Sequence, residues 1–130
     1  MSEGRHQIVN PPELPKPSGY AHAVVAAPGR TIWLGGQTGA GDTIAAQFDD
    51  AATSLIVALR AAGGEPDDLV SLVVYATDLD EYRTAMVELG EVWRRHFGLR
   101  YPAMALIGVS GLANPDSRIE LMGVAVVADG

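Results

Sequence analysis

Residues 69–77 read Leu-Val-Ser-Leu-Val-Val-Tyr-Ala-Thr and carry no charged side chain. A nearly continuous apolar run of this kind is typical of a strand in the middle of a sheet, where both faces are covered. Upstream of it, apolar residues recur at steps of three and four over 44–62, which marks one face of a helix. Asp42 or Thr43 offers the N-cap of that helix, and Gly63-Gly64 ends it.

The same periodicity predicts a second helix directly after the central strand. Asp78 or Asp80 caps this helix at its start, and Gly98 is its stop signal. Gly90 interrupts the pattern at a cost of about 1 kcal/mol relative to alanine, so we expect it to allow a close approach to the sheet. The expected inner face of the helix consists of Tyr82, Met86, Leu89, Trp93 and Phe97.

Further strands are predicted on either side of these elements. Residues 102–109 and 118–127 read as two strands joined by a turn-rich segment. Residues 20–27 and 31–35 carry the signature of a hairpin, because Pro28-Gly29 separates two β-prone runs.

The start of the chain, residues 1–19, contains four prolines and is expected to form an extended arm, with a short edge strand near 7–9. The whole chain, residues 1–130, then forms one α+β domain with the order β-β-α-β-α-β-β. Two helices cover one face of its mixed sheet. Because the last two strands carry apolar side chains on both faces, we expect the uncovered face to be buried in an oligomer.

The composition excludes several classes of function. Without cysteine, the 130-residue chain has no disulfide, thiolate metal site or cysteine nucleophile. Nine Lys and Arg against sixteen Asp and Glu give a net charge of −7, which makes nucleic acids and anionic membranes poor partners. No segment has the roughly 18–20 apolar residues of a membrane span, and no secretory signal precedes the prolines. We therefore expect a soluble, cytoplasmic protein.

Few side chains indicate chemistry by their spacing. His6, His22 and His96 share no metal-ligand spacing, so we expect solvated or capping histidines and no metal site. The chain has no Gly-x-Ser-x-Gly motif, and residues 39–41 lack the third glycine of a phosphate-binding loop.

Glu120 differs from the other acidic residues because it lies inside an apolar strand. A carboxylate in partly apolar surroundings can act as a general base or acid. The alternative is an edge-strand carboxylate that faces water or pairs with Arg118.

Six short blocks follow one another at characteristic spacings. They are Gly19-Tyr20-Ala21-His22-Ala23-Val24, Leu34-Gly35-Gly36-Gln37-Thr38-Gly39, Ala61-Ala62-Gly63-Gly64, Val74-Tyr75-Ala76-Thr77-Asp78-Leu79, Tyr101-Pro102-Ala103 and Ile119-Glu120. In this order they resemble the Rid family, the reactive intermediate deaminases once called L-PSP proteins. The resemblance covers about residues 18–127.

This resemblance implies a chorismate-mutase-like fold and a homotrimer whose small-molecule clefts lie between subunits. It also implies hydrolysis of enamines and imines such as 2-aminoacrylate to 2-keto acids and ammonia, without a metal or an organic cofactor. In such proteins an arginine directly after Pro-Ala binds the substrate carboxylate, and a strand glutamate, here Glu120, positions the attacking water. The cleft residues implied for this chain are Tyr20, Gly36, Gln37, Trp93, Met104 and Leu106.

The position of the arginine is occupied by Met104, and methionine cannot bind a carboxylate. The chain thus resembles an arginine-less branch of the family. Carboxylate-bearing imines are expected to be poor substrates, unless Arg5, Arg30 or Arg100 supplies the missing charge.

Three functions stay open at this point. The first is a hydrolase that acts on a neutral or otherwise recognised small molecule with Glu120 as base. The second is a non-catalytic small-molecule binder or regulatory trimer. The third, a ribonuclease, is disfavoured by the acidic net charge and by the absence of paired catalytic histidines.

Overall fold

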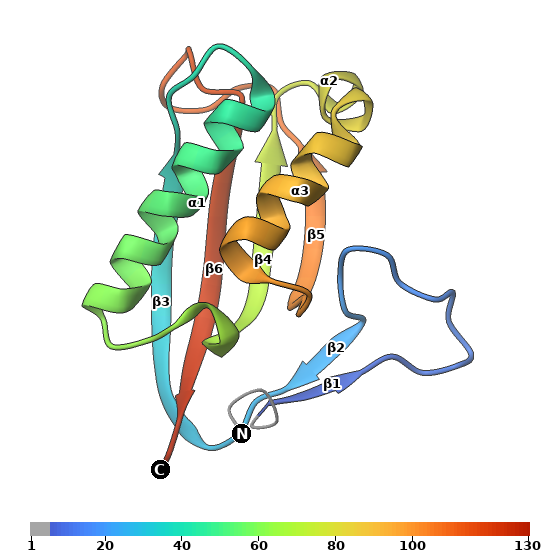
Figure 1. Ribbon diagram of the computed structural model, residues 1–130, viewed down its shortest axis with the longest axis vertical. Helices are drawn as coiled ribbons and strands as arrows, with labels where there is room; N and C mark the ends of the chain where they lie inside the picture. Colours follow the sequence, from blue (N-terminus) through green and yellow to red (C-terminus); the bar gives the residue numbers. More distant parts are fainter. Residues whose placement is uncertain (1–5) are drawn as a thin grey trace.

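The computed structural model describes residues 6–130, which form a four-stranded sheet with helices on one face (Figure 1). The strand order is β3-β6-β4-β5, so the central position predicted for β4 is confirmed. The sheet is mixed, because β4 and β5 run parallel while β6 is antiparallel to both β3 and β4. The strands are β3 (Gly29–Thr38), β4 (Leu69–Ala76), β5 (Ala103–Gly108) and β6 (Ile119–Ala128).

The helices are α1 (Ile44–Ala61), α2 (Leu79–Thr84) and α3 (Met86–Phe97), and a single 3-10 turn, η2 (Pro66–Asp68), precedes β4. Thr43 caps α1, because its hydroxyl accepts a hydrogen bond from the Ala46 amide at 3.1 Å. The Asp78 carboxylate accepts one from the Glu81 amide at 3.0 Å and caps α2. Within residues 6–130, no helix is long and apolar enough to cross a membrane.

The single helix predicted after β4 is wrong in one respect, since the structure divides it into α2 and α3. The break lies at Ala85, whose φ of −95° and ψ of 11° fall outside the helical region. The change of direction lets both pieces pack on the core, through Tyr82 of α2 and Leu89 of α3.

The core lies between the helices and one face of the sheet. The apolar stripe predicted for α1 is buried there: Phe48, Leu55 and Leu59 are at most 2% exposed. Leu72 and Val74 of β4 and Leu121 of β6 meet them from the sheet. Burial of each such side chain contributes about 1.5–3 kcal/mol to folding.

The hairpin predicted for residues 20–35 is wrong. β2 (Ala23–Val25) pairs with β1 (Gln7–Val9), which confirms the short strand near 7–9, and the two form a ribbon that projects from the main sheet (Figure 1). β3 instead pairs with β6. The bend at Pro28 is held by the other end of the chain, because the Asp129 amide donates to the Pro28 carbonyl at 2.9 Å.

His6 joins this ribbon to the main sheet. It is buried, with 4% exposure, so the expectation of a solvated or capping residue is wrong. Its Nδ1 accepts a hydrogen bond from the Ala27 amide at 3.0 Å, and Nε2 donates to the Val126 carbonyl at 2.7 Å. Both ring nitrogens therefore satisfy backbone groups that would otherwise be buried without partners.

A polar contact links α1 to α3. The Asp49 carboxylate accepts a hydrogen bond from His96 Nε2 at 2.5 Å and lies 3.6 Å from the Arg95 guanidinium. The hydrogen bond from His96 lowers the pKa of Asp49 below its usual value of 3.8, against the opposing effect of desolvation.

We expect this contact to make stability depend on pH in the acid range. A carboxyl whose pKa is lowered by folding stabilises the fold above about pH 4 and loses that contribution as the pH falls through its folded pKa. Thermal melts should show wild type more stable than Asp49→Asn at pH 6, with the difference shrinking below about pH 4. A difference that stays constant from pH 6 to pH 2 would contradict this assignment.

Candidate functional site

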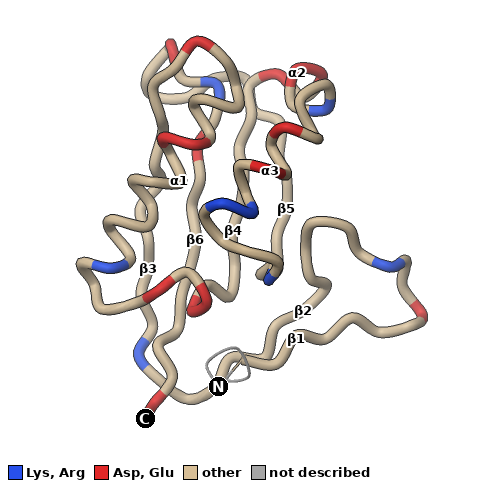
Figure 2. Tube along the Cα trace, in the orientation of Figure 1, with Lys and Arg blue, Asp and Glu red and all other residues tan. Residues whose placement is uncertain are grey.

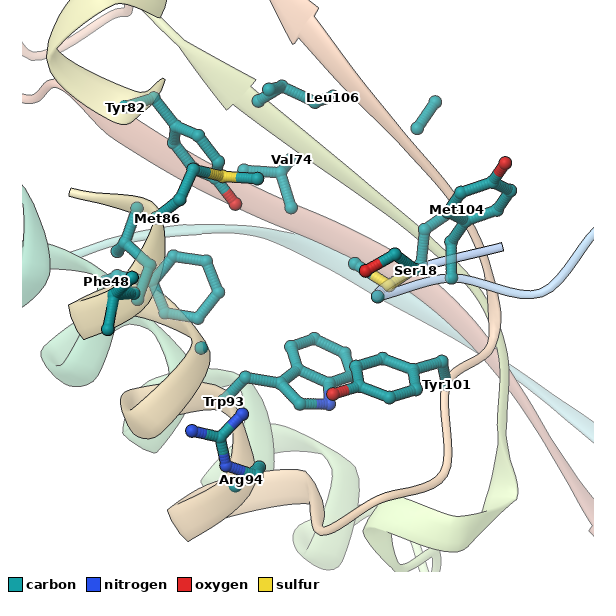
Figure 3. A pocket seen from close by; sticks show the side chains of 16 residues that line it. Ser18, Phe48, Val74, Tyr82, Met86, Trp93, Arg94, Tyr101, Met104 and Leu106 are labelled. Atoms are coloured by element: carbon teal, nitrogen blue, oxygen red, sulfur yellow. The ribbon is translucent and has the colours of Figure 1, made fainter. Parts of the chain in front are cut away.

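A pocket of about 530 Å³ opens on the helix side of the sheet, between α3 and β5 (Figure 3). Apolar and aromatic side chains make up most of its wall. The lining includes Ser18, Tyr20, Phe48, Tyr82, Met86, Leu89, Gly90, Trp93, Arg94, Tyr101, Met104 and Leu106.

The segment before β2 forms one side of the pocket. The Ala21 amide donates a hydrogen bond to the Pro102 carbonyl at 3.0 Å, and Ala21 bridges to Ala103 at the start of β5. Gly19 precedes this contact with a φ of 78°, which favours glycine. The fold thereby brings Ser18 and Tyr20 to the pocket, although they are about 85 residues away from β5 in sequence.

β5 supplies the opposite side. In the parallel register with β4, Met104 lies beside Leu72 and Leu106 beside Val74. Because Leu72 and Val74 are buried in the core, the side chains of Met104 and Leu106 also face the helix side of the sheet. Both line the pocket, and Met104 brings a thioether where the family resemblance calls for a guanidinium (Figure 3).

Trp93 of α3 is the largest aromatic residue of the pocket wall. Its ring is 5% exposed and stacks on Tyr101, with a centroid distance of 5.4 Å and an interplanar angle of 11°. The indole Nε1 is buried and has no hydrogen-bond partner among the residues that the structure describes. Buried donors in native proteins are nearly always satisfied, so this one calls for an explanation.

Gly90 and Met86 have different surroundings from those predicted. Gly90 does not approach the sheet: it lines the pocket, and a Cβ built on it would meet Arg94 Nη1 at 3.4 Å. Met86 was predicted for the buried inner face but is 55% exposed, because the helix begins anew there and leaves it at the pocket opening.

Arg94 is the cationic side chain that sequence reasoning missed. It is the one Lys or Arg in the pocket wall formed by the described residues (Figure 3). The sequence signal for this arginine was Gly90, which lies four residues before it on the same face of the helix. Because glycine has no side chain, it leaves space beside the arginine.

Two of the three arginines considered from the sequence lie away from the pocket. Arg100 donates to the His6 carbonyl at 2.7 Å and so anchors the β1–β2 ribbon. Arg30 lies beside Gly63, after the end of α1. Arg5 lies outside the described residues.

Glu120 faces the other side of the sheet. It neighbours Thr38 of β3 and Tyr75 of β4 in register, and its side chain lies over Gly36, where a Cβ would come within 2.3 Å of Oε2. The predicted alternative partner, Arg118, pairs instead with Glu81 and does not hold Glu120. Glu120 and Gly36 therefore lie together, away from the pocket of the same chain.

Gln37 is the remaining predicted cleft residue. It lies opposite Leu121 in the β3–β6 ladder, just after the irregularity between residues 34 and 37, and does not line the pocket. Of the seven predicted site residues, four meet in the pocket, namely Tyr20, Trp93, Met104 and Leu106.

Apart from the Arg94 guanidinium, the polar side-chain groups of the described pocket wall are neutral: the hydroxyls of Ser18 and the tyrosines, and the indole N–H of Trp93. Burial raises the pKa of the Tyr82 phenol above its usual value of 10, so this hydroxyl stays protonated near neutral pH and can donate a hydrogen bond. Within residues 6–130, no group of three or more His, Asp or Glu residues could hold a metal ion.

Comparisons with known proteins agree with this fold. The family model described as "Endoribonuclease L-PSP" matches residues 13–127. A YjgF/YER057c/UK114-family protein from Mycobacterium tuberculosis is 32% identical, with 94% of this chain and 99% of that chain covered and a TM-score of 0.67. A Rid-family protein of unknown function from Yersinia pestis is 27% identical, with 95% and 99% covered and a TM-score of 0.83.

No curated protein sequence matches the chain. Nevertheless the family model spans nearly all of it, and its α+β fold matches solved members of the same group. Membership supports a role in binding or processing a small molecule. The chain belongs to the Rid family, the YjgF/YER057c/UK114 group.

Proposed function

We propose that this protein is a homotrimeric hydrolase that converts a small enamine or imine to the carbonyl compound and ammonia. Glu120 takes a proton from water, and the resulting hydroxide adds to the imine carbon. The proton held by Glu120 passes to the nitrogen of the tetrahedral adduct, and transfer of the adduct's hydroxyl proton to the same nitrogen expels ammonia and forms the C=O bond. An enamine enters this sequence after a proton has moved from its nitrogen to its β-carbon, which makes it the imine. The observation that carries the proposal is the α3–β5 pocket with Tyr20, Trp93 and Leu106 at its wall.

The proposed reaction needs two copies of the chain. Met104 and Leu106 face the helix side of the sheet, whereas Glu120 lies with Gly36 on the opposite side. One chain therefore cannot bring its own Glu120 to its own pocket without unfolding the sheet. A cleft between subunits, as the family resemblance implies, lets the sheet face of one copy supply Glu120 to the pocket of its neighbour.

The uncovered sheet face suits such an assembly. Trp33, Ile107 and Met122 are 79%, 43% and 40% exposed in the single chain. Met122 alternates along β6 with the buried Leu121 and Gly123, so it points away from the helices. Large apolar side chains exposed on an uncovered sheet face are typical of an interface between subunits.

The direct test is an assay of ammonia release from freshly generated 2-aminoacrylate and from a neutral imine. The wild-type protein should accelerate at least one of these hydrolyses well above the buffer rate. Uncatalysed rates with both classes, from protein of trimeric size, would contradict the hydrolase.

Gly36→Ala is expected to lower hydrolysis at least about tenfold while leaving the fold intact. The new Cβ would overlap Glu120 Oε2 and Cδ, at 2.3 and 2.7 Å, so the flexible carboxylate must move. Misplacement of a catalytic group by about 1 Å can cost a hundredfold in rate. The matched control is Gly35→Ala, where no atom lies within 4 Å of the added Cβ. Equal rates for the two variants, with equal melting temperatures, would show that the carboxylate position does not matter.

A second candidate is a non-catalytic small-molecule binder. It is favoured by Met104, which removes the cation expected on β5. This candidate predicts that the wild-type protein binds a ligand while wild type and Glu120→Gln both leave imine hydrolysis at the buffer rate. The endoribonuclease activity in the family description gains no support from a chain with a net charge of −7.

A further inference from the structure

We propose that the α3–β5 pocket binds a neutral molecule that carries a carbonyl oxygen, and that the Tyr82 hydroxyl recognises this oxygen. Tyr82 is not among the cleft residues that the family resemblance implies. The inference rests on the proposed small-molecule role of the pocket and adds the chemical class of the ligand.

The first observation is the direction of the Tyr82 side chain. The chain breaks at Ala85, between α2 and α3, and Tyr82 packs against the core beside the pocket. Figure 3 shows its hydroxyl pointing into the pocket, on the side away from Arg94. Phe48 and Val74 of the same wall are at most 2% exposed. The hydroxyl is therefore a polar group in an otherwise apolar part of the pocket.

The second observation is that this hydroxyl has no partner yet stays accessible. It makes no hydrogen bond with any residue that the structure describes. Among the described side chains, the Trp93 indole nitrogen is the one polar atom that is both closed off and unpaired, so the Tyr82 oxygen remains open to the pocket.

The surroundings make this hydroxyl a strong donor to a ligand. Burial raises the pKa of the Tyr82 phenol above its usual value of 10, so the group is poorly hydrated and keeps its proton. A donor in poorly hydrated surroundings gains more from a ligand oxygen than the same donor gains in bulk water.

The third observation is the charge at this end of the pocket. The charged residues beside Tyr82 in α2 do not line the pocket, because Asp80 pairs with Arg83 at 3.1 Å and Glu81 pairs with Arg118. Figure 2 shows no charged position along β4 or β5. A carboxylate held here would lose its hydration without a cation to replace it, at a higher cost than a neutral carbonyl. The Tyr82 end therefore favours a neutral oxygen.

The remaining wall indicates the body of the ligand. Leu89 and Leu106 offer apolar contacts, and the stacked pair of Trp93 and Tyr101 offers an aromatic surface. A phenol donates one hydrogen bond, so a single carbonyl oxygen satisfies it. The pocket thus suits a compact apolar or aromatic body with one neutral carbonyl. In the proposed reaction, this carbonyl belongs to the part of the substrate that is not hydrolysed.

Acetophenone and α-methylstyrene form a matched pair of probes, because they differ only in the exchange of C=O for C=CH₂. NMR chemical-shift titrations give the affinity of each probe for wild type and for Tyr82→Phe, which loses the hydroxyl and keeps the ring. This substitution should weaken acetophenone binding roughly three- to tenfold and leave α-methylstyrene binding unchanged. The control Tyr101→Phe removes the hydroxyl of another tyrosine in the wall and should leave the ratio of the two affinities unchanged.

The hydrogen bond can also be observed at the tyrosine ring itself. The chain holds four tyrosines, Tyr20, Tyr75, Tyr82 and Tyr101, so isotope labelling of their Cζ atoms gives four signals. Acetophenone should shift the Tyr82 signal, because the attached hydroxyl donates to the carbonyl. α-Methylstyrene brings the same aromatic ring without the oxygen and should shift it much less. Tyr82→Phe assigns the signal.

Three results would overturn the inference: equal effects of Tyr82→Phe on both probes, loss of acetophenone selectivity in Tyr101→Phe instead, or no binding of either probe by wild type. These results differ from failure of the proposed function. Tyr82-dependent binding of acetophenone without any imine hydrolysis would contradict the hydrolase alone. Imine hydrolysis without this selectivity would contradict the Tyr82 site alone.

Discussion

Glu120→Gln is expected to lower the hydrolysis of imines by roughly a hundred- to ten-thousandfold, which is the usual contribution of a positioned general base. Glutamine keeps the size and shape of the side chain over Gly36 but cannot accept a proton from water. The carboxylate is thus the one group removed. Steady-state assays of ammonia release, over a range of imine concentrations, should show the loss in kcat.

Three further measurements make this result specific. The variant should keep the size of the wild-type assembly and its melting temperature, because glutamine preserves the shape of the side chain over Gly36. Glu91→Gln removes an equal charge from the exposed side of α3 and should keep full activity. A Glu120→Gln protein with wild-type kcat would rule out this carboxylate as the base.

Mixed assemblies test whether the site is shared between chains. Leu106→Trp should fill the pocket and Glu120→Gln should remove the base, so each homotrimer is expected to be inactive. In co-expressed mixtures, some clefts combine an open pocket from one chain with an intact Glu120 from the other. Recovery of activity in the mixture is therefore expected, and its absence would place the whole site within one chain.

Met122→Asp is expected to dissociate the assembly into monomers and to abolish hydrolysis with it. Wild-type protein should scatter light as a particle of about three times 13.6 kDa at micromolar concentration. Obligate interfaces typically bury more than about 2,000 Å², and an unpaired charge buried within one costs several kcal/mol per copy. A trimer would bury three such aspartates, so this cost would apply three times.

Val57→Asp is the matched control for this prediction. Val57 is 65% exposed on α1, on the helix side of the sheet, so an aspartate there stays in water and should leave the assembly intact. A stable wild-type monomer would contradict the proposed assembly outright. A Met122→Asp protein of trimeric size would remove the uncovered sheet face from the interface.

Local patterns were sufficient for most elements of the fold. The apolar run at 69–77 became the internal strand β4, and the stripe over 44–62 became α1 with Thr43 as its cap. These predictions succeed because burial and capping depend on residues three or four positions apart. The break at Ala85 was missed, since nothing in its immediate sequence competes with a continuous helix.

Strand partners depended on contacts that local patterns do not contain. Pro28-Gly29 was read as the turn of a hairpin, yet β2 pairs with β1 and β3 pairs with β6, some ninety residues away. The choice depends on which distant backbone groups become available during folding.

The same division holds for the site. The sequence by itself identified the family, which the comparisons confirm, and the absence of an arginine at position 104. The resemblance also implied Tyr20, Trp93, Met104 and Leu106 as cleft residues, and these four line the pocket of the single chain. Only the tertiary structure decided that Glu120 lies across the sheet from these residues, because strand alternation and register together select the face of each side chain. It also decided which arginine reaches the pocket. Arg94 does so because α3 forms one wall of the pocket, while the Arg100 side chain donates to the His6 carbonyl.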